Sequence, residues 1–289
     1  MNGFKIITDS ASDLDDGFLS ENDIGVVPFY ITADGNAYCK DKVEITSQEF
    51  YKVQRESKKF YKTSLPSVQD YLDEFNKYAS DVDIICFCLS SKLSGSYQSA
   101  VNAANIIKDE HPERVIVVID SQTASLGIGM KIKQAVLCRG RGMTAVQAEG
   151  YLLQNVAYIA LTVDTLEYLQ RGGRIGKVQA LAGELLNIRP IIQMVGGELV
   201  PHSKMRGRGK AVARLLEILD EAVGADLPGY VVAVAHSDCE EEARALRDQI
   251  EQKYGIFGKV DIVEIGVVIG AHTGPSVLAI SYLRNLSEG

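Results

Sequence analysis

Residues 83–138 have the sequence DIICFCLSSKLSGSYQSAVNAANIIKDEHPERVIVVIDSQTASLGIGMKIKQAVLC, in which apolar runs of strand length alternate with helical patterns. The apolar runs are 83–89 and 115–120, and the helical patterns are 100–108 and 125–138. Strands that alternate with helices are typical of a parallel sheet covered by helices. The stretch therefore predicts an N-terminal parallel-sheet α/β domain.

A hairpin and a capped helix are predicted before this stretch. Residues 24–32 and 37–43 are strand-like and flank Asp34-Gly35, a dipeptide that favours a tight hairpin turn. Ser67, with Asp70 three positions later, forms a capping box that opens a helix to about residue 79.

The C-terminal part predicts a mixed, partly antiparallel sheet. Strand candidates at 190–195 and 198–203 are joined by Gly196-Gly197, and strands alternate with helices afterwards. We place the boundary near residues 155–165, which gives an N-terminal domain at 1–160 and a C-terminal domain at 161–289. The expected fold class is two-domain α/β.

Composition and charge exclude several classes of protein. The 289 residues suggest two domains, and a net charge of −8 disfavours a nucleic-acid partner. No apolar run approaches the ~18 residues of a transmembrane segment, although transient membrane contact stays open.

The five cysteines have no metal-type spacing and fit a reducing cytoplasm. The four histidines form no ligand-spaced pair, so we expect no metal and no cofactor.

Familiar catalytic motifs are absent from the sequence. It has no Walker A motif, Gly127 and Gly129 lack the third glycine of a dinucleotide fingerprint, and no Gly-x-Ser-x-Gly occurs. Nucleotide binding and the common serine hydrolase arrangement have no support.

Two hydroxyl-rich segments are the main candidates for a binding site. Residues 90–96 follow a predicted strand and precede a helix, where free N–H groups favour an anion. Thr63 and Ser64 offer hydroxyls just before the helix that Ser67 caps. If the fold brings both segments to one sheet edge, they would suit a carboxylate or phosphate. The alternative is that such serines only cap helices.

His272 and two basic stretches are further candidates. His272 is predicted to lie in a Gly- and Pro-rich loop at 270–275, and His236 at a strand end competes with it. Arg174 in 171–174 and Arg206 in 204–210 would fit a phosphate or an acidic partner. A helix C-cap and a solvated turn are the respective alternatives.

Six short motifs are spread along the chain: DSASDL at 9–14, TSLPS at 63–67, LSGSYQSA at 93–100, LEYLQRGGRI at 166–175, LNIRPI at 186–191 and HTGP at 272–275. They occur in the order seen in DegV-family proteins, which the chain resembles from Asp9 to Pro275. Two departures are Ser96, where many relatives have threonine, and Ser276, where glycine is common.

The resemblance implies a non-catalytic protein that binds one long-chain fatty acid. By resemblance, Thr63, Ser64, Ser94, Gly95 and His272 would hold the carboxylate. Some family members are the fatty-acid-binding subunit of a bacterial fatty acid kinase, whose catalytic subunit is a separate ATP-using protein.

The same resemblance gives the basic residues a role outside lipid binding. Arg174 and Arg206 would contact the acyl phosphate or the kinase. No residue is assigned a catalytic role. The alternative function is acyl transfer or hydrolysis with Ser94 as nucleophile and His272 as base.

Overall fold

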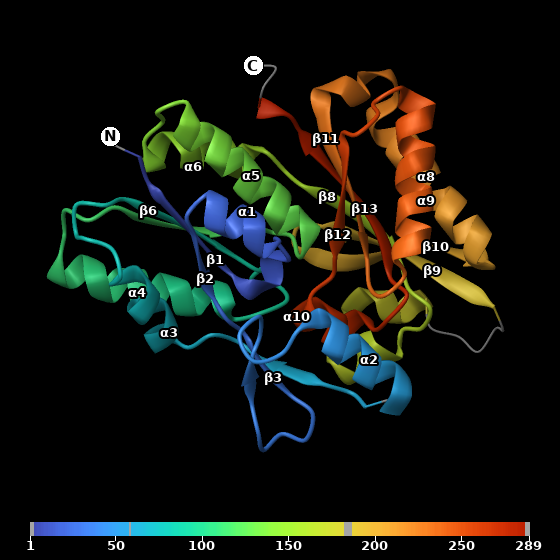
Figure 1. Cartoon of the computed structure of the whole chain (residues 1–289), viewed down its shortest axis with the longest axis horizontal. Coiled ribbons are helices and arrows are strands. Elements are labelled where there is room, and N and C mark those ends of the chain that lie inside the picture. Colours follow the sequence, from blue (N-terminus) through green and yellow to red (C-terminus); the bar gives the residue numbers. More distant parts are fainter. Residues whose placement is uncertain (1–2, 58, 182–186, 287–289) are drawn as a thin grey trace.

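Two large sheets, each covered by helices, and one small sheet form the framework of the chain (Figure 1). The computed structural model describes residues 3–57, 59–181 and 187–286. Leu186, the first residue of one predicted motif, lies outside these residues.

The first sheet is parallel and buried on both faces. Its strands run in the order β2 (Ile24–Val27), β1 (Lys5–Asp9), β6 (Ile84–Cys88) and β7 (Ile116–Asp120). Every residue of β1 and β6 is buried, as expected for strands covered on both faces. The predicted parallel α/β domain is confirmed. Helices α3 (Val68–Phe75) and α4 (Ser96–Glu110) pack on one face, and α5 (Leu126–Gly140) and α6 (Ala145–Gln154) on the other.

The second sheet is mixed, as predicted. Only the β11–β12 pair is parallel among its described strand pairs. Helices α8 (Arg208–Val223) and α9 (Glu240–Tyr254) cover one face. The strand order is β10 (Glu198–Arg206), β9 (Ile188–Val195), β8 (Tyr158–Thr162), β13 (Leu278–Arg284), β11 (Tyr230–His236) and β12 (Val260–Glu264).

Helix α5 packs between the two large sheets. Ile128 and Ile132 belong to the core of the first sheet. Leu126 and Met130 belong to the core on the face of the second sheet that α8 and α9 do not cover. A helix that is apolar on several faces is stable only when it is buried on them. This helix therefore ties the two halves together.

Two predictions for the N-terminal part are wrong, because some of its residues form the small sheet. Residues 24–32 were expected to form one strand, but β2 ends at Val27, and β3 (Tyr30–Thr32) belongs to the small sheet. Pro28 separates them, because proline has no N–H to donate to a ladder. Thr63, expected in a helix entry, lies in strand β5 (Lys62–Ser64), which pairs with β3.

The hairpin and the helix cap are confirmed. Strand β4 (Cys39–Lys40) pairs antiparallel with β3 across a turn in which Gly35 has φ +84°. The Ser67 capping box is formed with both of its hydrogen bonds.

The predicted loop around His272 is a helix. Helix α10 (Val267–Thr273) carries His272 in its last turn and buries Val267, Val268 and Ala271. The glycine and proline that suggested a loop instead end the helix, since Gly274 has φ +78°. The solvated turn given as the alternative for 204–210 is not formed as such, because β10 continues to Arg206 and α8 begins at Arg208.

The remaining helical elements are the 11-residue helix α2 (Ser47–Ser57) and several shorter ones. The shorter ones are α1 (Asp16–Glu21), α7 (Glu167–Arg171) and the 3-10 helices η1 (Ser10–Ser12), η2 (Gly176–Leu181) and η3 (Gly224–Gly229). No described helix is long and apolar enough to cross a membrane.

The large sheets take their strands from residues up to 120 and from 158 onward. The domain boundary at 160 stays a prediction.

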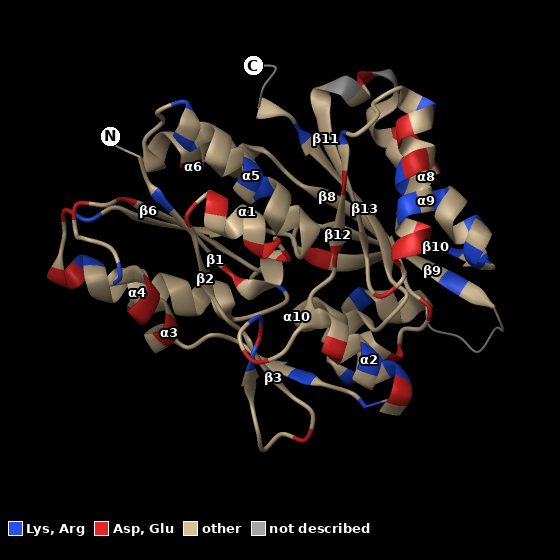
Figure 2. Cartoon of the chain, in the orientation of Figure 1, with Lys and Arg blue, Asp and Glu red and all other residues tan. Residues whose placement is uncertain are grey.

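Acidic and basic side chains are interspersed on the helices. Figure 2 shows both signs side by side along α8 and α9. Interspersed charges leave no single-sign face there to attract a polyanion.

Candidate functional site

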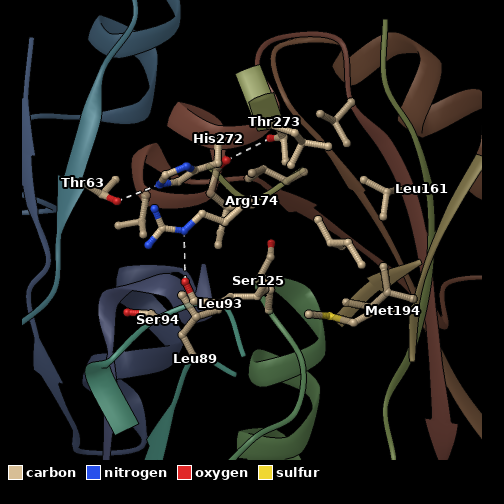
Figure 3. A pocket seen from close by; sticks show the side chains of 18 of the residues that line it. Thr63, Leu89, Leu93, Ser94, Ser125, Leu161, Arg174, Met194, His272 and Thr273 are labelled. Carbon is tan, nitrogen blue, oxygen red and sulfur yellow. Dashed lines mark hydrogen bonds between the residues drawn. The ribbon is translucent and has the colours of Figure 1, made fainter. Parts of the chain in front are cut away.

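An apolar cavity of about 210 Å³ lies between the two halves of the chain (Figure 3). One water needs only about 10–15 Å³, so the space suits a larger molecule. Strands β5, β8 and β9, helices α7 and α10, and the loop after β6 contribute to its wall. Most of the lining is aliphatic and includes Leu89, Leu126, Leu161, Leu169, Met194 and Ile269.

Polar side chains gather at one end of this cavity. The hydroxyl of Thr63 on β5 lies 2.7 Å from Nε2 of His272 on α10. These residues are 209 positions apart, and the pairing of β5 with β3 brings them together. Ser64 and Ser94 also line the cavity. Thr63, Ser94, Arg174 and His272 lie on the same side in Figure 3.

His272 is neutral at pH 7. Burial, and then the positive charge of Arg174, lower the pKa of His272 to about 4. A neutral imidazole can donate one hydrogen bond and accept another.

Gly172 leaves the space that His272 occupies. A Cβ atom at position 172 would collide with Nδ1 of His272. Gly172 is the C-cap of α7 and has φ −76°, so space rather than backbone conformation requires glycine here. The C-cap interpretation made from the sequence is confirmed, and the packing role is a finding of the structure.

Arg174 lies in the cavity wall rather than on the outer surface. Its Nη1 donates to the carbonyl of Gly172 at 2.7 Å, and its Nε donates to the carbonyl of Leu93 at 3.1 Å. The guanidinium is thereby fixed beside His272 (Figure 3). A fixed guanidinium is well suited to a carboxylate or phosphate oxygen.

The buried carboxyl group of Asp9 holds the loop after β6 in place through two hydrogen bonds. Asp9 accepts hydrogen bonds from the Leu89 N–H and the Ser96 hydroxyl, both at 2.8 Å. Burial raises the pKa of Asp9 to about 6. Serine at position 96, a departure from the family pattern, still makes this contact.

Gly95 and Arg206 are not among the described residues that line the apolar cavity. A Cβ at Gly95 would lie 3.2 Å from Cδ2 of Leu65, so glycine here lets the segment after β5 close on the loop after β6. Arg206 ends β10 and is exposed. His236 is buried at the end of β11 and also lies outside the cavity lining.

The Ser–His arrangement that acyl transfer needs is not formed among the described residues. His272 pairs with Thr63, whereas the Ser94 hydroxyl accepts from the Ser96 N–H at 3.2 Å. A histidine with a pKa of about 4 is also a weak base at pH 7.

Ser125 lines the cavity and was missed in the sequence. It follows β7 just as the loop containing Ser94 follows β6, and these strands are parallel neighbours. The carboxyl ends of neighbouring parallel strands meet at one edge of a sheet. Applied to both strands, this rule predicts that Ser125 lies at the same sheet edge as Ser94.

The wall of a second cavity, of about 450 Å³, has an excess of acidic side chains. The acidic residues are Asp13, Asp15, Asp16, Asp41, Asp261 and Glu264, and the basic ones are Lys42 and Lys133. Such a wall repels a carboxylate. The apolar cavity with the basic and neutral donors is therefore the candidate site for an amphipathic acid.

The chain is similar to known proteins over almost its whole length. The family model described as "Uncharacterised protein, DegV family" matches residues 3–285. A Thermotoga maritima protein named "Fatty acid-binding protein" is 32% identical over 281 residues, which are 95% of each chain.

Solved structures share the whole fold. A stearic acid-binding protein from Eubacterium ventriosum matches with a TM-score of 0.91 and 32% identity, over 99% of this chain and 100% of that one. A DegV family protein from Thermus thermophilus, whose structure is described as one of fatty acid binding, has a TM-score of 0.86 and 30% identity. That match covers 98% of this chain and 100% of the other.

Proposed function

Because the chain belongs to the DegV family, we propose that it binds one long-chain fatty acid in the apolar cavity, with the carboxylate at the polar end. The observation that carries the proposal is an aliphatic cavity with the Thr63–His272 pair, Ser94 and Arg174 gathered at one end. Relatives named for stearic acid and fatty acid binding support this ligand class.

Thr63, Ser64, Ser94 and His272 hold the carboxylate in this proposal. The single N–H of neutral His272 donates to the Thr63 oxygen, so that Thr63 donates its own proton to the carboxylate together with Ser64 and Ser94. Gly95 acts indirectly, by letting Leu65 approach the loop that carries Ser94. Arg174 adds the positive charge that the carboxylate needs once water has left.

The tail supplies most of the affinity, and the head group supplies the orientation. About 14 buried methylenes at ~0.8 kcal/mol each contribute about 11 kcal/mol. One neutral hydrogen bond contributes about 1 kcal/mol net. The polar end therefore distinguishes an acid from an ester or alkane, since an unpaired buried carboxylate is costly.

We further propose that the chain is a cytoplasmic carrier that presents the carboxylate to a separate kinase. The kinase would transfer the γ-phosphoryl group of ATP to the carboxylate, giving an acyl phosphate and ADP. The carrier itself would break no bond, and exposed Arg206 would contact the kinase or the new phosphate. The Arg206→Ala variant should then lower acyl phosphate formation with the kinase and ATP while the affinity for fatty acid is unchanged.

Binding titrations test the lipid site. Thr63→Ala and Ser94→Ala should each weaken octadecanoate binding about five- to tenfold, because each removes about 1 kcal/mol of hydrogen bonding. Ser91→Ala is the matched control, since Ser91 lies in the same loop but bonds to Asp120 outside the cavity. Methyl octadecanoate should bind more weakly than the acid. Equal affinity for acid and ester, unaffected by both substitutions, would contradict the proposal.

A further inference from the structure

One polar side chain in the cavity stands apart from the polar end. Ser125 lies between that end and the apolar side chains of Leu161 and Met194, with its hydroxyl toward the cavity (Figure 3). The carboxylate site described above does not use this hydroxyl.

Ser125 is held as a hydrogen-bond acceptor. Its hydroxyl donates to Oδ2 of Asp13 at 2.5 Å, and both residues are buried, with 3% and 8% of their surface exposed. Because the proton of the hydroxyl is directed to the carboxylate, the lone pairs of the serine oxygen remain for a ligand.

The backbone at Ser125 is in a conformation that glycine would adopt more easily. Its φ is +51° and ψ is −128°, and its N–H donates to the carbonyl of Ala11 at 2.9 Å. Such conformations cost of order 1–3 kcal/mol in non-glycine residues and concentrate at functional sites. Here the conformation presents a hydroxyl to an otherwise aliphatic part of the wall.

The other hydroxyl in this region does not have the same support. Thr273 donates to the carbonyl of Ile269 in its own helix, as helical threonines commonly do. The Ser125–Asp13 pair instead joins residues 112 positions apart.

We propose that Ser125 is a second polar contact in the acyl cavity, which selects a fatty acid carrying a hydroxyl on its chain away from the carboxylate. The ligand hydroxyl donates to the Ser125 oxygen, which in turn donates to Asp13. This inference rests on the proposed fatty-acid function and adds a ligand class to it. A hydroxyl beside the aliphatic side chains, out of reach of a polar group of the wall, would be buried without a partner, which is unfavourable.

A series of hydroxyoctadecanoic acids, each with its hydroxyl at a different carbon, tests the proposal against delipidated protein. One position should bind at least as tightly as octadecanoate and about tenfold more tightly than positions two carbons away, the effect of one matched hydrogen bond. The Ser125→Gly variant should remove this maximum, so that every hydroxyoctadecanoic acid binds the variant more weakly than octadecanoate does. Glycine tolerates φ +51°, so the variant removes the hydroxyl without adding backbone strain.

Two results would overturn the proposal. Either every hydroxyl position binds more weakly than octadecanoate, or the maximum persists in Ser125→Gly, in which case the bond to Asp13 is only structural. If the proposed function itself fails, octadecanoate does not bind the wild-type chain at all, so the two failures are distinguishable.

Discussion

His272 depends on a glycine that touches it from another element. Gly172 is 100 positions away in the sequence, and its lack of a side chain leaves room for the imidazole. No local pattern predicts this, because the C-cap role alone explains the glycine. The site thus contains a positioning residue that has no polar side chain.

Substitution of this glycine should disturb ligand binding. The Gly172→Ala variant should displace His272 and weaken octadecanoate binding about tenfold or more, measured by titration, since the carboxylate would lose a hydrogen bond and fixed geometry. Gly209→Ala is the control, because Gly209 is exposed on α8 and a Cβ there meets no neighbouring atom within 4 Å. Equal affinities in both variants would show that the contact with Gly172 is unimportant.

Asp13 links the site to the pH dependence of stability. Burial raises the pKa of Asp13 to about 7 from 3.8. An acid with a raised pKa binds its proton more tightly in the folded chain. Its contribution to the free energy of unfolding is therefore full below pH 3.8 and is lost as the pH rises toward 7.

The Asp13→Asn variant should reveal this loss. Between pH 6 and pH 8, the difference in unfolding free energy between variant and wild type should shift by about 1.4 kcal/mol in favour of the variant, measured by urea denaturation. Histidine titration is common to both proteins and cancels. Asp16→Asn, at a side chain that is 87% exposed, is the matched control. The same pH profile in all three proteins would refute a raised pKa at Asp13.

At the scale of elements, local chemistry predicts most of the structure. The capping box at Ser67, the Asp34-Gly35 turn and the Gly196-Gly197 turn are all present, because each depends on neighbouring residues. The pairing of β5 with β3 and the helix at His272 were not predicted. Both depend on packing against segments that are distant in the sequence.

The tip of the β9–β10 hairpin contacts the loop that carries Ser94. Ser90 donates to the carbonyl of Gly197 at 2.8 Å, and a Cβ at Gly197 would lie 2.5 Å from the Ser90 hydroxyl. The hairpin belongs to the second sheet and the loop to the first. This contact therefore connects the two halves next to the cavity.

Two glycine-to-alanine substitutions distinguish the effect of losing this contact from the effect of backbone strain, because both positions have nearly the same φ. Gly197 has φ +83° and Gly35 has φ +84°, but a Cβ at Gly35 meets no atom within 4 Å. Both alanine variants should lose about 1 kcal/mol of stability, whereas Gly197→Ala alone should also lower octadecanoate affinity several-fold. Loss of affinity in both, or in neither, would argue against a role of the contact in the site.

At the scale of the whole molecule, the cavity belongs to neither half alone. Thr63 and Ser94 come from the N-terminal part, whereas His272, Arg174 and Met194 come from the C-terminal part. The sequence supplied the candidate side chains through the family resemblance, but their convergence and the void beside them follow from tertiary packing. Helix α5 packs on both halves, and its Leu126 lines that void.

The central claim is that a fatty acid occupies this void, and native mass spectrometry of the freshly purified chain tests it most directly. We predict one non-covalent adduct per chain with the mass of a long-chain fatty acid, which organic extraction removes and added octadecanoate restores. A chain that is bare after purification and stays bare after incubation with octadecanoate would contradict the account.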